Sequence, residues 1–213
     1  MKKLKLALCL ACTLLVASVS EVAQAQTPLN FGIKGGLNIS NLSGDLMDDY
    51  DHRVGLTIGA VVDISIPLSP VGVETGVYYS QKGAAFSDEF NINGDLFNFD
   101  GTFKLDYLEV PILAKVNFGP PGPLGLHVVA GPYVSYLLNA EYDESINGGT
   151  ETYDVSDDIE PIDIGLTGGL GVDFNLGLTK LNVQARYSMG MLDVEDGMDY
   201  KNRVISVVAG FTF

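Results

Sequence analysis

The chain has 213 residues, of which 46% are hydrophobic, and a formal net charge of −15. This acidic excess excludes a nucleic-acid-binding protein, which needs a basic surface to neutralise phosphates. The hydrophobic content also excludes a disordered acidic chain, because so many apolar residues can form a core or cover a surface. The length fits one folded domain, or one domain with a small second one.

The first 25 residues have the three parts of a cleaved secretory signal peptide. Lysines stand at the start, residues 6–19 form an apolar run, and residues 23–25 read Ala-Gln-Ala, which is a cleavage site. A membrane anchor is the alternative, but the apolar run is short for a spanning helix. We therefore predict export, cleavage after Ala25, and a single domain over residues 26–213.

Cleavage would change both the charge and the cysteine content of the chain. The two cysteines, Cys9 and Cys12, lie inside the apolar run, so the exported chain would hold none. We therefore expect neither a disulfide nor a thiolate metal site in it. Its net charge would be −17.

The exported chain alternates between apolar and polar residues, which is the pattern of strands with one apolar face. Helical periodicity is absent, and no run of eighteen apolar residues predicts a transmembrane helix. The alternation is clearest around Val54, Leu56 and Ile58, which share one face. Eight strands are predicted in this way, at residues 30–40, 53–65, 71–82, 104–118, 126–140, 162–174, 180–191 and a last one that ends at Phe213.

Two closed barrels fit eight such strands, and they differ in which face points inward. A soluble, lipocalin-like barrel would bury the apolar face, whereas a membrane barrel would turn it toward lipid. Twelve strand glycines lie on polar faces, and two, Gly35 and Gly168, lie on apolar faces. Glycine weakens a water-facing strand for no gain, but inside a narrow barrel it leaves room for large side chains. We therefore predict an all-β, eight-stranded antiparallel up-and-down transmembrane β-barrel.

The predicted connections alternate between short and long, as they do in outer-membrane barrels. The short ones, residues 66–70, 119–125 and 175–179, carry no charge. The long ones hold 20 acidic residues and one base, Lys201, a net charge of −19. We expect short turns on the periplasmic side and these long acidic loops at the cell surface: residues 41–52, 83–103, 141–161 and 192–201.

The polar faces would bring charged side chains into the barrel interior. Because an unpaired buried charge is very costly, opposite charges there must pair. We predict a structural network of salt bridges that fills the lumen, with a gated ion path as the alternative. The predicted network comprises Lys34, Arg53, Glu74, Glu109, Lys115 and Arg186, with Tyr78, Tyr107 and Tyr133 beside it.

Two other functions are weaker alternatives. A lipid A-modifying enzyme would need a histidine with a serine and an acid; His127 has no serine nearby in sequence, and His52 has Ser43 and several aspartates. Acidic loop segments, at residues 154–158 or at Asp45 with Asp48 and Asp49, could hold Ca²⁺ or Mg²⁺, but neither has EF-hand spacing. No cofactor, metal site or catalytic residue is therefore predicted.

Five segments resemble the PorT-like, OmpA-like outer-membrane β-barrel family of Bacteroidota, and the strand-four segment YLEVPILAK is the most specific. They are FGIKGGLN at residues 31–38, ETGVYYSQKG at 74–83, YLEVPILAK at 107–115, GPYVSYL at 131–137 and GFTF at 210–213.

The resemblance implies an integral, eight-stranded outer-membrane protein with no catalytic residues. Phe211 and Phe213 resemble the terminal signal read by the barrel-assembly machinery. The expected partners are that machinery, outer-membrane lipids and lipopolysaccharide, and proteins of the surface or of a secretion system, since some members serve type IX secretion. The predicted role is structural or surface-interacting, with a small porin-like channel as the alternative.

Overall fold

The computed structural model describes residues 29–43, 51–92, 95–119, 122–146, 149–195 and 200–213. The predicted signal peptide, both cysteines and the three aspartates of the first loop (Asp45, Asp48, Asp49) lie outside these residues, so those interpretations stay predictions. Within the described part of the chain, no helix is long and apolar enough to cross a membrane.

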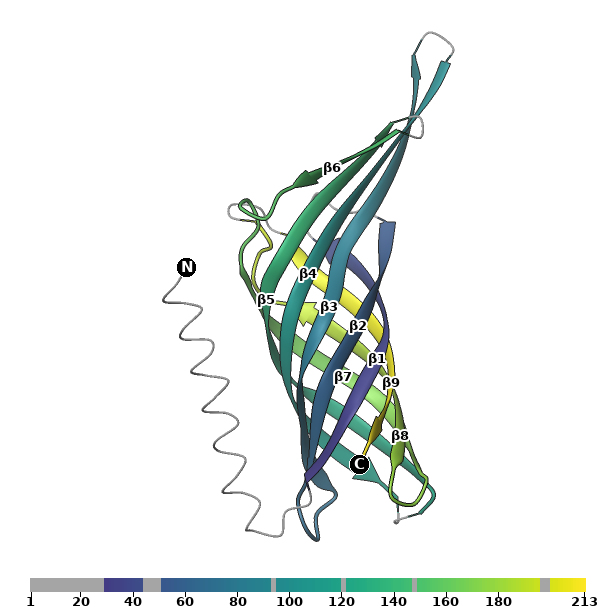
Figure 1. Cartoon of the computed structure of the whole chain (residues 1–213), viewed down its shortest axis with the longest axis vertical. Helices are drawn as coiled ribbons and strands as arrows, with labels where there is room; N and C mark the ends of the chain where they lie inside the picture. Colours follow the sequence, from purple (N-terminus) through teal and green to yellow (C-terminus); the bar gives the residue numbers. More distant parts are fainter. Residues whose placement is uncertain (1–28, 44–50, 93–94, 120–121, 147–148, 196–199) are drawn as a thin grey trace.

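Eight antiparallel strands close into a ring, in the order β1, β2, β3, β4, β5, β7, β8, β9 and back to β1 (Figure 1). The ninth, β6, pairs with the outer end of β5. The strands are β1 (Leu29–Ser43), β2 (Asp51–Ser65), β3 (Val71–Ile92), β4 (Asp95–Phe118), β5 (Leu124–Ile146), β6 (Gly149–Asp154), β7 (Ile162–Asn175), β8 (Lys180–Gly190) and β9 (Lys201–Thr212). The predicted eight-stranded barrel is confirmed.

The ring closes where the first and last strands meet. The amide of Phe213 donates to the carbonyl of Phe31 at 2.8 Å, and the amide of Phe31 donates back at 3.2 Å. Both Phe211 and Phe213 point outward and are exposed. The proposed assembly signal therefore lies at the seam of the barrel, next to the first strand.

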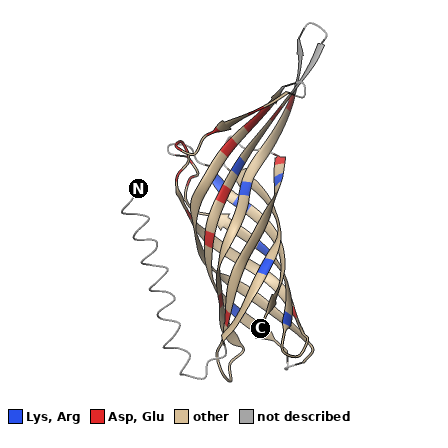
Figure 2. Cartoon of the chain, in the orientation of Figure 1, with Lys and Arg blue, Asp and Glu red and all other residues tan. Residues whose placement is uncertain are grey.

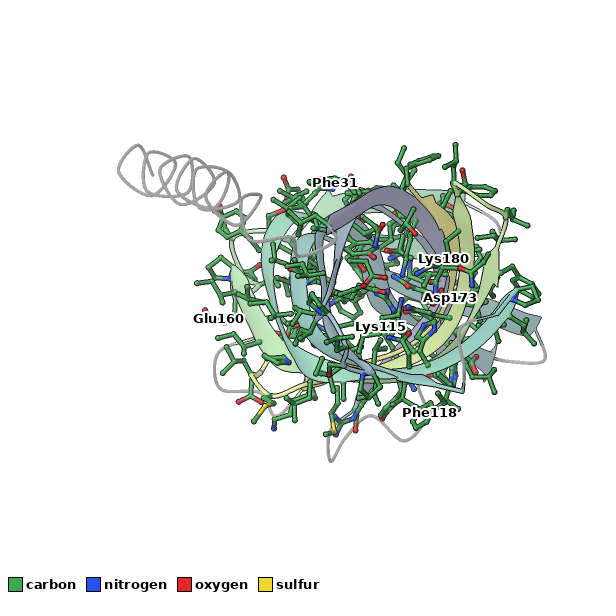
Figure 3. The ribbon with its side chains drawn as sticks, turned by 90° about the horizontal axis from the view of Figure 1, so that it is seen from below. Phe31, Lys115, Phe118, Glu160, Asp173 and Lys180 are labelled. Atoms are coloured by element: carbon green, nitrogen blue, oxygen red, sulfur yellow. The ribbon has the colours of Figure 1, made fainter. Side chains whose placement is uncertain are left out.

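Within the ring, the two faces of the strands have opposite chemistry, as predicted for a membrane barrel. On β9, Ile205 and Val207 are 47% and 53% exposed, whereas the alternating residues Ser206 and Val208 are buried. Figure 3, seen along the barrel, shows Lys115 and Asp173 inside the ring and Phe118 outside it. The apolar side chains therefore form a continuous outer surface, and the polar ones fill the interior.

Two predicted long loops are instead mostly strand, so that part of the prediction is wrong. β3 and β4 stay paired from Gly83 opposite Lys104 to Ile92 opposite Asp95, and β5 continues to pair with β6. We call β3 residues 83–92, β4 residues 95–103, β5 residues 141–146 and β6 the surface extension. It rises beyond the ring (Figure 1).

The surface extension escaped prediction because it has no lipid-facing side. Backbone hydrogen bonds hold its strands together, so regular apolar alternation is not required. Its aromatic residues add packing: the ring of Phe86 lies 5.7 Å from that of Phe99, and Phe103 lies 4.8 Å from Tyr142. Its sequence holds nine acidic residues and no basic ones. Figure 2 shows acidic residues of its described part gathered toward this end.

The three short connections lie together at the end opposite the surface extension. We name this end the periplasmic end and the other the cell-surface end, after the orientation that the loop lengths predict. Tight turns join β2 to β3, β4 to β5 and β7 to β8. Gly119 and Gly177 have φ angles of +90° and +91°, in the left-handed region that glycine enters without steric cost. These turns keep successive strands adjacent and leave the long connections to the other end.

Matched alanine substitutions on β7 test the inward direction of the polar face. A Cβ at Gly171 would overlap Nε2 of His127 and lie 2.6 Å from Cγ of Gln184, whereas one at Gly168 would meet nothing within 4 Å. We expect Gly171→Ala to lower the free energy of unfolding by about 1–3 kcal/mol through overpacking. Gly168→Ala should leave it within about 0.5 kcal/mol.

Urea unfolding from lipid vesicles, followed by circular dichroism and by heat modifiability on gels, measures both variants. Equal effects at the two positions would contradict the assignment of the faces.

Candidate functional site

Glu74 accepts hydrogen bonds from three side chains at the middle of the lumen. Nζ of Lys34 lies 2.8 Å from Oε2 of Glu74, and Nη2 of Arg186 lies 2.6 Å from Oε1. Nε2 of Gln184 donates to Oε2 at 2.9 Å. Glu74 itself is 2% exposed, so this carboxylate joins β1, β3 and β8 across the barrel interior in a place that water scarcely reaches.

A second group of ion pairs lies toward the periplasmic end. Nζ of Lys115 lies 2.7 Å from Oδ2 of Asp63 and 3.3 Å from Oδ2 of Asp173. The same nitrogen lies 4.0 Å from Oε2 of Glu74, which connects the two groups. Together they hold three basic side chains and three carboxylates, so their formal charges balance. We call them the central network: Lys34, Asp63, Glu74, Lys115, Asp173, Gln184 and Arg186.

The central network flanks both ring nitrogens of His127, with a hydrogen bond at Nε2 and a contact to Asp173 at Nδ1. Oε1 of Gln184 accepts from Nε of Arg186 at 2.7 Å, so the amide nitrogen of Gln184 must face His127 and Glu74. Nε2 of His127 therefore accepts a hydrogen bond from Gln184 at 3.0 Å, and Nδ1 faces Oδ2 of Asp173 at 3.3 Å. This assigns the ring proton to Nδ1. The arrangement orients the imidazole within the network.

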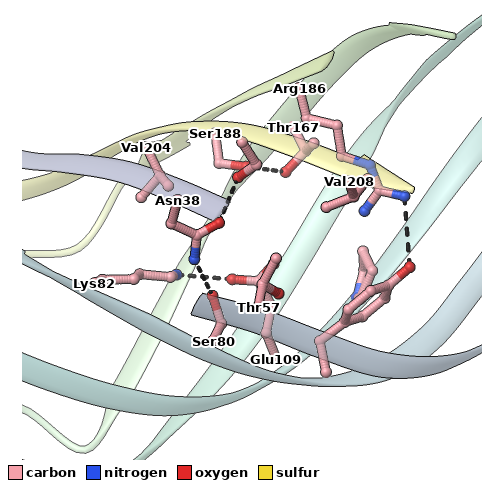
Figure 4. A pocket seen from close by; sticks show the side chains of 13 residues that line it. Asn38, Thr57, Ser80, Lys82, Glu109, Thr167, Arg186, Ser188, Val204 and Val208 are labelled. Carbon is pink, nitrogen blue, oxygen red and sulfur yellow. Dashed lines mark hydrogen bonds and ion pairs between the residues drawn. The ribbon is translucent and has the colours of Figure 1, made fainter. Parts of the chain in front are cut away.

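Above the central network, hydroxyl and amide groups line a small cavity of about 20 Å³ (Figure 4). Oγ1 of Thr167 lies 2.7 Å from Oγ of Ser188, and Asn38 donates to Oγ of Ser80 at 3.0 Å. Ser206 donates to the side-chain oxygen of Asn38 at 2.8 Å. This volume holds about one water molecule. The free space here is therefore too small for a hydrated ion.

A second network, which we call the Lys82 network, lies between the cavity and the cell-surface end. Nζ of Lys82 lies 2.8 Å from Oε2 of Glu109 and 3.2 Å from Oδ2 of Asp163. It also lies 5.0 Å and 4.5 Å from the ring centroids of Tyr107 and Tyr133, within cation–π range. One cation and two carboxylates therefore meet where little water is present.

An apolar cluster closes the lumen at the cell-surface end. Ile159 and Val194 come from connections outside the strands, yet they are only 8% and 5% exposed. The amide of Glu160 donates to the carbonyl of Val194 at 2.8 Å, which ties the two connections together. We call this cluster the apolar cap, and it consists of Leu42, Ala84, Leu105, Tyr107, Leu137, Ala140, Ile159 and Val194.

The structure places five of the six predicted lumen residues in ion pairs, in two networks rather than one. Lys34, Glu74, Lys115 and Arg186 lie in the central network, and Glu109 lies in the Lys82 network. Nη1 of Arg53 instead donates to the backbone carbonyl of Lys82, and Arg53 makes no ion pair with any residue that the structure describes.

Four charged members of the networks are absent from the predicted set. Each of them occupies a polar-face position of a predicted strand, which was the available signal. What the sequence does not show is which distant strand supplies the partner. The four are Asp63, Lys82, Asp163 and Asp173.

Among the described residues, no side-chain arrangement matches either the lipid A-modifying enzyme or the divalent-cation site that the sequence offered as weaker alternatives. The side chain of His127 contacts Asp173, Asn182 and Gln184, and His52 is exposed. No group of three His, Cys, Asp or Glu side chains there could hold a metal ion. In residues 154–158, Oδ1 of Asp154 instead accepts from the amide of Ser156 at 3.0 Å.

Substitution of Glu74 tests the central network. Glu74→Gln leaves Lys34 and Arg186 without a carboxylate in a dry interior, so we expect a loss of about 3–5 kcal/mol in the free energy of unfolding. Glu160→Gln, the same change at an exposed site, should have an effect below about 0.5 kcal/mol. Adding Lys34→Met to Glu74→Gln should recover part of the loss, because it removes one of the unpaired cations.

Urea unfolding in lipid vesicles measures the free energy of unfolding of these three variants. A Glu74→Gln barrel as stable as the Glu160→Gln barrel would contradict the network's role.

An ion pair joins Asp143 of the surface extension to Lys104, the β4 residue directly next to it. The hydrogen bond from Lys104 and a second one from Thr152, at 2.8 Å, hold the pKa of Asp143 below its usual range. Because the folded-state pKa is depressed, the resulting stabilisation is present above the ordinary pKa of aspartate. It is lost as the pH falls through the folded-state value.

Lys104→Met should raise the pKa of Asp143 toward that of an ordinary aspartate. The lost stability at neutral pH should be below about 1 kcal/mol, because the pair is partly exposed. Carboxyl ¹³C chemical shifts recorded against pH give the pKa, with Lys180→Met, at the far end of the barrel, as the control. An unmoved titration midpoint in the Lys104→Met protein would refute the assignment.

Comparison with known proteins agrees with this architecture. A family model described as "outer membrane protein beta-barrel domain" matches residues 23–196. A comparison with curated proteins finds no match.

Several solved structures are similar in fold. Neisserial surface protein A is 15% identical, with 86% of this chain and 97% of that chain covered and a TM-score of 0.47. Ail, the attachment invasion locus protein of Yersinia pestis, is 19% identical, with 86% and 98% covered and a TM-score of 0.42. OprG from Pseudomonas aeruginosa is 14% identical, with 87% and 95% covered and a TM-score of 0.45.

The family model spans most of the chain, including strands on all sides of the ring, and the outer surface is apolar while the lumen is charged and filled. The chain belongs to the outer membrane protein β-barrel domain family.

Proposed function

We propose that this protein is a non-conducting outer-membrane barrel that presents its acidic surface extension to a partner outside the membrane. The observation that carries the proposal is the filled lumen. Two ion-pair networks, a cavity for about one water and the apolar cap follow one another along the barrel axis. With the interior occupied, the surface extension is the largest feature available for interaction.

The chemistry of the surface extension supports a polar, cation-bearing partner. It carries nine acidic residues and no basic ones. Acidic side chains such as Glu151 and Asp154 are exposed, and Tyr153 is 45% exposed beside them. Exposed tyrosine among charges of one sign is typical of surfaces that recognise proteins.

The proposal includes the finer assignments that the sequence motifs favour. Residues 1–25 act as a cleaved export signal, and Phe211 and Phe213 are read by the barrel-assembly machinery. The PorT-like segments favour a bacterium of the Bacteroidota and a role in envelope integrity or protein secretion, with a surface or secretion-system protein as the partner. The proposal assigns the protein no reaction and no cofactor.

Shortening the surface extension separates its role from that of the barrel. Ala85 pairs with Thr102, and Asp143 pairs with Thr152, so each hairpin can be closed there with a two-residue Asn-Gly turn. The replaced segments are residues 86–101 and 144–151. The matched control keeps both hairpins at full length and changes Asp88, Asp100, Glu144 and Glu151 to their amides.

A deletion strain complemented with each version is scored for detergent sensitivity and for secreted protein. We expect the full chain to restore both, the shortened barrel to restore neither although it folds and inserts, and the amide version to restore them partly. Full restoration by the shortened barrel would contradict the proposal and place the role in the barrel itself.

A further inference from the structure

Arg203 is a basic side chain on the outer, apolar face of the barrel. The alternation along β9 turns Asn202 inward, where it donates to Asp163, and turns Arg203 outward with Ile205 and Val207. Arg203 is therefore the next outward-facing residue after Ile205 toward the cell-surface end of β9.

The neighbouring strands place Arg203 at the boundary of the apolar surface. It lies opposite Met189 of β8, which is 37% exposed, and opposite Asn41 of β1. Ile39, two residues before Asn41 on the same face, is 40% exposed. On the outer face, Arg203 therefore stands where exposed apolar positions toward the barrel centre give way to polar positions such as Asn41.

Within the described residues, Arg203 has no carboxylate partner. Its side chain makes no hydrogen bond or ion pair there, and its Nη1 atom is buried without an acceptor. Two lysines near the same end do have carboxylate partners: Lys104 pairs with Asp143, and Lys201 pairs with Asp193 at 3.1 Å. Carboxylates of the described part of the chain therefore pair with these lysines but not with Arg203.

A half-buried guanidinium at the edge of an apolar belt needs an anion from elsewhere. Head-group phosphates lie at this depth in a bilayer, and basic side chains at the ends of spanning segments reach toward them. Guanidinium matches phosphate with two parallel hydrogen bonds, which an ammonium cannot reproduce. The surrounding Met189 and Ile205 would contact the lipid's acyl chains at the same time.

We propose that Arg203 binds a phosphate group of a lipid in the outer leaflet, the phosphates of lipopolysaccharide lipid A being the anions available there. The proposal rests on the cell-surface orientation given above. It adds a lipid site on the barrel wall to a function that otherwise concerns the surface extension. A lipid held at this point would fix the height and rotation of the barrel in the membrane.

Native mass spectrometry of the full barrel released from detergent tests the site. The probes are bisphosphorylated lipid A, the same lipid after enzymatic dephosphorylation, and inorganic phosphate. We expect wild-type protein to retain bisphosphorylated lipid A at least threefold more tightly than the dephosphorylated form, and inorganic phosphate not to compete at equal concentration.

The variants are Arg203→Gln, Arg203→Lys and the control Lys180→Gln at the periplasmic end. Arg203→Gln should lose the preference for the phosphorylated lipid, Arg203→Lys should keep part of it, and Lys180→Gln should keep it all. Circular dichroism and heat modifiability establish whether each variant is folded. If a variant does not fold, the comparison of the two lipids on wild-type protein still tests the proposal.

Equal retention of both lipids by wild-type protein would overturn the proposal, as would an unchanged preference in folded Arg203→Gln. Competition by inorganic phosphate at equal concentration would overturn the assignment to a lipid.

Discussion

Charges buried in a narrow barrel must be neutralised by other charges inside the same barrel, since neither lipid nor bulk water is available to them. Glu74 illustrates this constraint, because its one carboxylate accepts hydrogen bonds from Lys34, Arg186 and Gln184 on two other strands. Lys115 then joins Glu74 to Asp63 and Asp173. Apart from the contact between Lys115 and Glu74, which lie on the consecutive strands β4 and β3, these contacts link strands that are not neighbours in sequence. The network therefore also helps to fix how the ring closes.

The constraint explains the distribution of glycine. Small residues such as Gly171 and Gly59 stand where a large partner, His127 or Tyr78, folds inward. Outward positions carry exposed apolar side chains that suit lipid contact. The acidic residues that give the chain its negative charge gather mainly beyond the ring, where water can solvate them (Figure 2). Glycine, apolar residues and acidic residues are thus concentrated in three different places: the lumen, the lipid-facing wall and the end that is exposed to water.

The sequence predicted what depends on local pattern and missed what depends on distant partners. Period-two alternation gave eight strands and the inward direction of Lys34, Glu74 and Arg186, because neighbouring side chains report which face is polar. Lys82 lay on that same polar face, but its partners Glu109 and Asp163 are set by the register of strands far along the chain. The pairing could not be read from one sequence.

The surface extension and the apolar cap were missed for related reasons. A sheet that rises into water keeps its backbone hydrogen bonds without an apolar face, so its strands look like loops in sequence. Ile159 and Val194 are single apolar residues in acidic connections, and they become a lid only because both connections fold over Leu105 and Leu137. Such contacts are tertiary, and no local period marks them.

We propose that this filled lumen is closed to ions, and conductance measures that directly. The purified full barrel is reconstituted into a planar lipid bilayer and held at moderate voltage in symmetrical salt. We predict current at the level of the bare bilayer, because about 20 Å³ of free space between two ion-pair networks passes no hydrated ion. A stable, large open state would contradict it.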